Sequence, residues 1–174
     1  MTLAYVFFHR PTAGLAAASY EEALRRFHSA LATAAPPGFI SSTTYRIGDG
    51  YGDWYLVSSS AALDHLSDAA VSGVRGPAHD AAARMAAEGT GKLLRLAGGE
   101  PDLAAASEVR FSKPTGVSYE DLYRRLEQWT GGSGVSLWRR MMVLGPPPEF
   151  CLVTPSPVQL PAEMNPQVLT RTRI

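Results

Sequence analysis

The sequence predicts an α+β protein made of two consecutive units, each with the element order β-α-β-β-α-β. The first observation behind this prediction is an internal repeat. Residues 8–12 (FHRPT) and 19–22 (SYEE) recur as residues 111–115 (FSKPT) and 118–121 (SYED). A repeat constrains the architecture more strongly than any local pattern does. The second observation is that each copy of the motif begins at the end of a run rich in aromatic or β-branched residues. A run with helical spacing follows it, which indicates a strand followed by a helix.

The first half contains four predicted strands, at residues 3–9, 39–47, 53–59 and 92–97. Apolar residues spaced three and four apart predict a helix after Ser19 and two further helices, at 61–71 and 78–88. Ser19 is expected to cap the first helix. Glu21 and Glu22 would then lie in its first turn, where negative charge stabilises the helix dipole.

The second half repeats this order with shorter helical parts. Its strands are predicted at residues 108–112, 135–144, 149–154 and 167–174. A helix is predicted at 118–129 with Ser118 as its cap, and one or two helical turns within 158–164.

The chain is therefore divided into a first repeat at 1–99 with an extra helical segment, a linker at 100–107, and a shortened second repeat at 108–174. Only the first half carries the long helical insertion at 61–91. We expect a ligand pocket in that half, because the shared residues of the two copies build the scaffold and the unshared ones are free to specialise.

Composition narrows the classes of function. Lys+Arg and Asp+Glu both number 16, so the net charge is zero and gives no argument for binding nucleic acid or an anionic membrane. No apolar run approaches the roughly 20 residues of a membrane-spanning helix, and the N-terminal residues lack the pattern of a signal peptide. The single Cys151 excludes an internal disulfide and a multi-cysteine zinc site. We expect a cytoplasmic protein, and the richness in Ala, Gly, Arg and Pro is typical of a GC-rich bacterial genome.

The element order, the repeat, the segment 37–39 (PGF) before the second strand and the segment 91–96 (GKLLRL) as the last strand resemble the dimeric α/β-barrel superfamily of ferredoxin-like folds. The chain resembles a tandem fusion, in which two ferredoxin-like repeats bring their antiparallel sheets face to face. The resemblance implies a small-molecule enzyme of specialised metabolism. Such an enzyme would be a cofactor-independent cyclase, isomerase or monooxygenase acting on an aromatic or polyketide-like substrate, as a monomer or homodimer.

Two other functions follow from the same resemblance. One is a haem-binding protein or enzyme, with His65 or His79 as axial ligand. The other is a non-catalytic ligand-binding or stress-response protein. No two histidines have the i, i+4 spacing of a helical metal site, so we expect no metal centre.

The candidate proton-transfer groups are His9 and His65, because imidazole titrates near neutrality. His9 ends the first strand, and its counterpart in the repeat is Ser112, so the scaffold does not require a histidine there. His65 and His79 lie in the helical insertion found only in the first half, and His79 is a candidate for substrate binding. His28 is expected at the surface. Each histidine can also be read as a strand-end or solvated helix residue.

Aromatic and arginine side chains complete the predicted site. Tyr45, Trp54 and Tyr55 are candidate walls for a planar substrate, although aromatic residues at these positions also suit an ordinary core. Arg46 is a candidate catalytic group that stabilises a developing oxyanion, and Arg139 a candidate substrate-binding group. Arginines in strands can equally occupy sheet edges with solvated ends.

Overall fold

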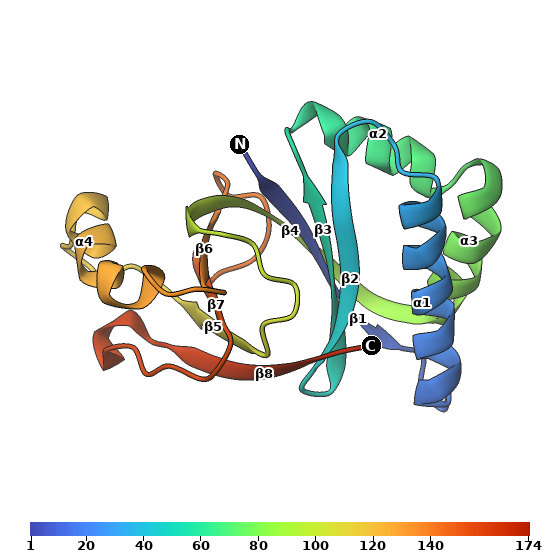
Figure 1. Ribbon diagram of the computed structural model, residues 1–174. Helices are drawn as coiled ribbons and strands as arrows, with labels where there is room; N and C mark the ends of the chain where they lie inside the picture. The colour runs from blue at the N-terminus through green and yellow to red at the C-terminus, as the bar shows by residue number, and fades with distance from the viewer.

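The computed structural model describes residues 1–174 and contains one closed antiparallel barrel with helices packed outside it (Figure 1). The strands are β1 (Leu3–Pro11), β2 (Phe39–Ile47), β3 (Gly50–Val57), β4 (Ala86–Gly99), β5 (Ser107–Phe111), β6 (Ser136–Arg140), β7 (Phe150–Thr154) and β8 (Gln167–Arg173). The helices are α1 (Ala17–Thr33), α2 (Ala61–Ala70), α3 (Gly76–Met85) and α4 (Tyr119–Thr130), with short 3-10 turns η1 (Gly73–Arg75) and η2 (Ala162–Met164).

The strand order confirms the predicted fold class. Around the barrel it is β1-β3-β2-β8-β5-β7-β6-β4. The first half contributes β4-β1-β3-β2 and the second contributes β8-β5-β7-β6, so each half has the order fourth, first, third, second. This is the antiparallel order of a ferredoxin-like unit. Two such sheets are joined edge to edge by the antiparallel pairs β2–β8 and β4–β6. The joined edges leave no exposed strand edge in the barrel.

The interior of the barrel is filled with side chains. Successive residues of a strand point to opposite faces, so Tyr45, Trp54 and Trp138 point inward and are each 1% exposed. The rings of Trp54 and Trp138 meet edge to face, with centroids 5.5 Å apart, and join the two halves. In the segment between β4 and β5, Leu103 packs on this cluster, and its carbonyl accepts a hydrogen bond from the Tyr45 hydroxyl.

Helices α1, α2 and α3 all cover the outer face of the first sheet, whereas α4 covers the second (Figure 1). The buried stripe of α1 contains Tyr20, Leu24, Phe27 and Leu31, at helical spacing. It packs toward the outward-facing residues of β1 and β3. No helix in the structure has the length and apolar character needed to cross a membrane.

Some predicted boundaries are wrong for identifiable reasons. Helix α1 begins at Ala17 and follows Ala16, so Ser19 does not cap it and no acidic residue lies in its first turn. Ser118, by contrast, does cap α4, where its side chain accepts a hydrogen bond from the backbone N–H of Asp121 at 3.0 Å. Strand β4 begins at Ala86, inside the stretch predicted as helix, because residues 86–87 pair with the end of β1.

The aligned motifs also differ in orientation. Phe8 points into the barrel, where the Arg110 guanidinium lies 4.2 Å from the centre of its ring. Phe111, its counterpart in the sequence motif, points outward toward α4 and stacks on Phe150. A shift of one residue in a strand moves every side chain to the other face. The outward face of the second half is lined by apolar core residues such as Val109 and Phe111, whereas that of the first half also carries the polar side chains of His9 and Asp53.

Candidate active site

An apolar cavity of about 440 Å³ lies between the outer face of β1 and β3 and the three helices of the first half. Sixteen residues line it: Tyr5, Phe7, His9, Tyr20, Leu24, Phe27, Asp53, Tyr55, Leu63, Leu66, Ser67, Ala70, His79, Ala82, Ala83 and Ala86. Most are aromatic or aliphatic. The polar groups are His9 and Asp53 on the sheet and Tyr20, Ser67 and His79 on the helices. This is the composition of a site for a small, largely apolar ligand. The helices of the insertion supply one wall, in agreement with the expectation that the first half holds the pocket.

Two glycines of β4 make room for the aromatic floor of the cavity. A Cβ at Gly91 would lie 2.5 Å from the Tyr5 hydroxyl oxygen, and a Cβ at Gly89 would lie 2.4 Å from Cζ of Phe7. Real carbon atoms do not approach so closely, so these rings can lie across β4 only because both positions lack a side chain. The close approach keeps Tyr5 and Phe7 flat against the sheet and leaves space beneath the helices.

The polar groups of the cavity form a chain from α1 through β1 to β3. The Tyr20 hydroxyl lies 2.6 Å from Nδ1 of His9. Nε2 of His9 lies 3.2 Å from Oδ1 of Asp53, although the two atoms are not aligned as a regular hydrogen bond. Tyr20 is fully buried, and His9 and Asp53 are each 3% exposed. This is the order of groups found in catalytic triads, with a phenol in the place of the serine.

Asp53 is held as a buried carboxylate by several donors. The Thr44 hydroxyl donates to Oδ1 at 2.6 Å and the Tyr55 hydroxyl donates to Oδ2 at 3.1 Å. Nε2 of His28 lies 3.5 Å from Oδ1. Burial alone would raise the pKa of Asp53, but the contacts with His28 and His9 outweigh it and lower that pKa below its ordinary range. Asp53 is therefore anionic at neutral pH.

The tyrosines of the site are neutral donors. Burial raises the pKa of Tyr20 and of Tyr55, and the nearby Asp53 carboxylate raises both further. Because Asp53 can only accept hydrogen bonds, we assign the His9 tautomer that carries its proton on Nε2. Nδ1 of His9 then accepts the hydrogen bond from Tyr20. The site at rest has one phenol proton pointing at an imidazole that is oriented by a carboxylate.

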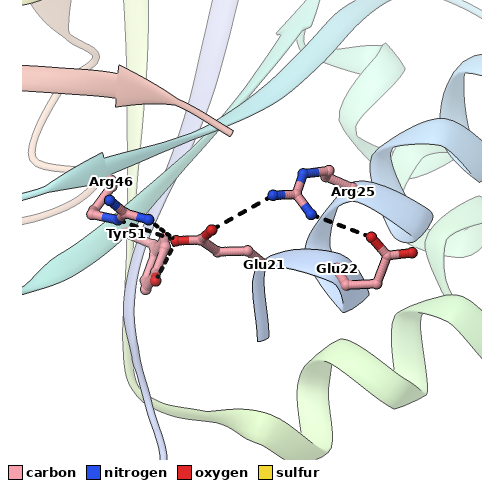
Figure 2. Close-up of polar contacts among 5 residues, drawn as sticks. All are labelled: Glu21, Glu22, Arg25, Arg46 and Tyr51. Carbon is pink, nitrogen blue, oxygen red and sulfur yellow. Dashed lines mark hydrogen bonds and ion pairs between the residues drawn. The ribbon is translucent and has the colours of Figure 1, made fainter. Parts of the chain in front are cut away.

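A second polar cluster, centred on Glu21, holds the Tyr51 ring that stacks on His9. Oε1 of Glu21 accepts hydrogen bonds from Arg46 and from the Tyr51 hydroxyl, the latter at 3.0 Å, and Oε2 faces Arg25 at 3.6 Å (Figure 2). The Tyr51 ring is nearly parallel to the His9 ring, with centroids 5.9 Å apart. Glu21 thus fixes a ring that stacks on the imidazole, and Arg46 fixes Glu21.

The structure divides the predicted aromatic and histidine candidates between two faces of the sheet. His9, Tyr55 and His79 line the cavity together. Tyr45 and Trp54 point into the barrel interior, on the opposite face, where burial raises the pKa of Tyr45 to about 12. Alternation along β3 explains the split, because Trp54 and Tyr55 are neighbours and must face opposite ways.

The other candidates lie outside the cavity. His65 is exposed on α2. The guanidinium of Arg46 donates to Oε1 of Glu21, which also accepts from the Tyr51 hydroxyl. Arg139 belongs to the second half, where its Nε donates to Glu149 at 2.7 Å and its guanidinium lies 3.6 Å from the centre of the Tyr119 ring. None of the three lines the cavity.

Sequence reasoning missed Tyr20, Asp53 and His28 as functional candidates. His28 was expected at the surface, but it is 8% exposed and contacts Asp53. Helical spacing could have identified Tyr20 and His28 as buried. Both lie three or four residues from Leu24 or Phe27 or directly beside them, on one face of the helix: Tyr20, Leu24, Phe27 and His28. For Asp53, the signal was a carboxylate between two outward-facing tyrosines of one strand, Tyr51 and Tyr55.

The lining of the cavity does not fit haem. It contains no Lys or Arg, and its acidic residue Asp53 would oppose the carboxylates of the haem group. His79 reaches the cavity, but its Nδ1 lies 3.1 Å from Oδ1 of Asp80 and its ring packs edge to face on Phe27.

No family model matches the sequence, and no curated protein matches it. Solved structures do match. A putative monooxygenase from Lactobacillus acidophilus NCFM aligns with a TM-score of 0.63 and 9% identity, over 99% of this chain and 94% of that chain. An anthrone oxidase-like protein aligns with a TM-score of 0.60 and 11% identity, over 99% and 91%. A putative chlorite dismutase aligns with a TM-score of 0.58 and 12% identity, over 99% and 95%.

At such identities the similarity establishes the fold, whereas activity has to be argued from the site. The matches extend over nearly the whole chain, and the chain itself closes the barrel from two sheets of the same strand order. The protein therefore has the dimeric α/β-barrel fold, with both ferredoxin-like units of the barrel in a single chain.

Proposed function

We propose that the protein is a cofactor-independent monooxygenase that acts on an enolisable aromatic compound of the polyketide type. The observation that carries this proposal is the Tyr20–His9–Asp53 chain at the wall of an aromatic cavity. Planar apolar walls suit a fused-ring substrate, and a buried phenol–imidazole–carboxylate chain suits removal of a weakly acidic proton.

The first step is proton transfer. A C–H bond of a CH2 group that is conjugated with a carbonyl of the substrate through the ring system breaks. Its proton moves to the Tyr20 oxygen while the Tyr20 proton moves to Nδ1 of His9. The substrate is left as an enolate. The imidazolium formed at His9 is stabilised by the Asp53 carboxylate 3.2 Å away. Asp53 keeps its negative charge throughout, in line with its lowered pKa.

The second step uses the electrons of the enolate. The enolate reduces O2, and one oxygen atom becomes bonded to the substrate carbon. The other oxygen leaves as water, which takes up the remaining hydrogen of that carbon and the proton held at His9, so a CH2 group and O2 give a C=O group and H2O and His9 is neutral again. The substrate supplies all four electrons, and no added reductant is required. The surrounding apolar residues exclude water and favour this reaction over reprotonation by solvent. Structural similarity to a putative monooxygenase and to an anthrone oxidase-like protein supports the choice of reaction.

The test uses a hydroxylated anthrone as probe, with purified protein and no added metal, flavin or nicotinamide. We expect faster O2 uptake than in buffer, and one labelled oxygen atom in the product when labelled O2 is supplied. The His9→Gln variant corrects for autoxidation of the probe and should be slower by about 10²-fold or more. Equal rates for wild type and variant would refute the proposal. Turnover without O2 uptake would assign the same proton transfer to an isomerase or cyclase instead.

A further inference from the structure

His28 and Ser42 make a close polar contact between helix α1 and strand β2. Nδ1 of His28 lies 2.7 Å from the Ser42 hydroxyl oxygen. On the other side of the same ring, Nε2 of His28 lies 3.5 Å from Oδ1 of Asp53. This nitrogen is buried and has no aligned hydrogen-bond partner. The imidazole of His28 therefore lies between a hydroxyl group and a buried carboxylate.

The direction of these contacts follows from the charge of Asp53. A carboxylate can only accept hydrogen bonds, so we assign the His28 tautomer that carries its proton on Nε2, facing Asp53. Nδ1 of His28 then accepts the hydrogen bond from the Ser42 hydroxyl. The order of hydroxyl, imidazole and carboxylate is the one that activates a serine as a nucleophile, here with the two ring nitrogens in exchanged roles. Catalytic contacts are often long before substrate binds, as the contact between His28 and Asp53 is.

His28 and Ser42 line an open depression that is separate from the cavity. Its volume is about 230 Å³, and its other lining residues are Arg25, Ser29, Thr43, Thr44, Arg173 and Ile174. None of its residues lines the cavity. Because the depression is small and polar, it suits a short acyl group rather than a fused-ring compound. Asp53 is the group that the two places have in common, since its Oδ1 also lies 3.2 Å from Nε2 of His9.

Arg173 brings an unpaired positive charge to the depression. Its Nε donates to the Thr43 hydroxyl oxygen at 3.1 Å, which holds the guanidinium beside β2, and its two terminal nitrogens have no partner in the protein. Arg25 also lines the depression, but it is paired with Glu21 and Glu22. A negative charge that develops on a carbonyl oxygen in the depression is therefore stabilised best by Arg173.

We propose that Ser42, His28 and Asp53 form a second catalytic site, which hydrolyses short acyl esters. The Ser42 oxygen attacks the ester carbonyl carbon while its proton moves to Nδ1 of His28, and the Asp53 carboxylate stabilises the imidazolium. The bond from that carbon to the alcohol oxygen breaks, and the alcohol leaves with the proton held at His28.

The second half of the reaction restores the protein. A water molecule gives a proton to Nδ1 of His28 and attacks the acyl group on Ser42. The bond from the acyl carbon to the Ser42 oxygen breaks, the carboxylic acid leaves, and the proton at His28 returns to Ser42. One ester and one water give one acid and one alcohol. This activity does not depend on the oxygenation proposed for the cavity.

The first test is covalent labelling of Ser42, which needs no turnover. A fluorophosphonate probe forms a phosphorus–oxygen bond to an activated serine and releases fluoride, and peptide mass spectrometry locates the label. We expect the label on Ser42, with labelling slower by about tenfold or more in His28→Gln, because glutamine cannot act as the base. Ser41, the neighbouring serine of β2, does not line the depression and should stay unlabelled. Absence of the label from Ser42, or equal labelling in His28→Gln, would overturn the proposal.

The second test is hydrolysis of para-nitrophenyl acetate, followed by the release of nitrophenolate. Ser42→Ala and His28→Gln should each lower kcat/KM by about 10²-fold or more, and Arg173→Gln by a smaller factor. Ser41→Ala is the matched control and should keep the wild-type rate, since hydrolysis by surface side chains is the same in both serine variants. Equal rates for Ser42→Ala and Ser41→Ala would refute the esterase. A preference for the octanoate ester over the acetate would contradict the assignment to this small depression.

The anthrone probe separates the two sites. We expect His9→Gln to slow oxidation of the anthrone, Ser42→Ala to slow ester hydrolysis, and Asp53→Asn to slow both, because Asp53 faces both imidazoles. Ester hydrolysis that depends on Ser42 in a protein that oxidises no anthrone would contradict the proposed function and leave the esterase standing. Oxidation of the anthrone without labelling of Ser42 would do the reverse.

Discussion

The Tyr20 hydroxyl and Nδ1 of His9 lie 2.6 Å apart, and this contact joins helix α1 to strand β1 inside the sheet–helix layer of the first half. It orients the imidazole so that its other nitrogen faces Asp53. The Tyr51 ring packs edge to face on Tyr20 and stacks on His9, so neither side chain is free to turn. The preorganised pair is what gives an otherwise apolar cavity a defined chemistry.

Removal of the Tyr20 hydroxyl should impair turnover more than stability. Tyr20→Phe keeps the buried ring but breaks the proton chain, so we expect kcat for the anthrone probe to fall by about tenfold or more. Loss of one hydrogen bond should cost about 1 kcal/mol of unfolding free energy. Tyr123→Phe is the control, because the Tyr123 hydroxyl lies in the second half and has no hydrogen-bond partner. Similar kcat values for the two variants would exclude Tyr20 from the chemistry.

Gly91→Ala should reduce the space for substrate. The added methyl group would meet the Tyr5 ring at 2.5–2.9 Å, and the ring must move. We expect KM for the probe to rise by about threefold to tenfold, corresponding to roughly 1 kcal/mol of strain or lost contact, with a smaller effect on kcat. Gly98→Ala in the same strand is the control, since its nearest neighbour would lie 3.9 Å away. A Gly91→Ala variant with wild-type KM would place the ligand elsewhere.

Asp53 should make stability depend on acidic pH. Its folded-state pKa is lowered, so the unfolded chain binds the proton more readily. The stability that Asp53 contributes is therefore fully present above the unfolded pKa of about 4, and it is lost progressively as the pH falls below that value toward the folded pKa. Urea unfolding between neutral and acidic pH should show a weaker dependence for Asp53→Asn than for wild type. Asp68→Asn, exposed on α2, should keep the wild-type dependence.

Trp138 should hold the two halves of the barrel together. Trp138→Ala removes the ring that packs on Trp54 and should lower the free energy of unfolding by about 3–5 kcal/mol. Trp129 on α4 is only partly buried, so Trp129→Ala should cost less. Denaturant unfolding followed by circular dichroism measures both. A loss in Trp138→Ala no larger than that in Trp129→Ala would show that the interior contact does not join the halves.

Haem should not bind in the cavity. Because no cationic side chain lines it, titration with haem should produce no Soret shift that depends on His79. The comparison of wild type with His79→Ala makes the experiment decisive, since non-specific haem association would be the same in both. A Soret band that disappears in His79→Ala would contradict the assignment and restore the haem alternative.

The sequence predicted the element order and the fold class because both depend on local patterns. The alternation in the strands and the helical spacing after Ser19 are patterns of residues close together in the chain. The FHRPT-type motif is also a local pattern, and its recurrence shows that the same element order occurs twice. The predicted ends of helices and strands were wrong where pairing between distant strands determined them. Residues 86–87 joined β4 rather than extending α3 because the end of β1 offered them hydrogen-bond partners.

The sequence by itself determined which residues of one strand share a face, such as Tyr5 and His9 on β1. Only the tertiary structure decided which face meets the helices and encloses the cavity, and which face fills the barrel. It also decided the partners of His9. Tyr20 and Asp53 lie on α1 and β3, and no local spacing reveals that two packed elements bring a phenol and a carboxylate to the two nitrogens of one imidazole. Such a site arises from the packing of helices on a sheet, which depends on contacts between residues far apart in the chain.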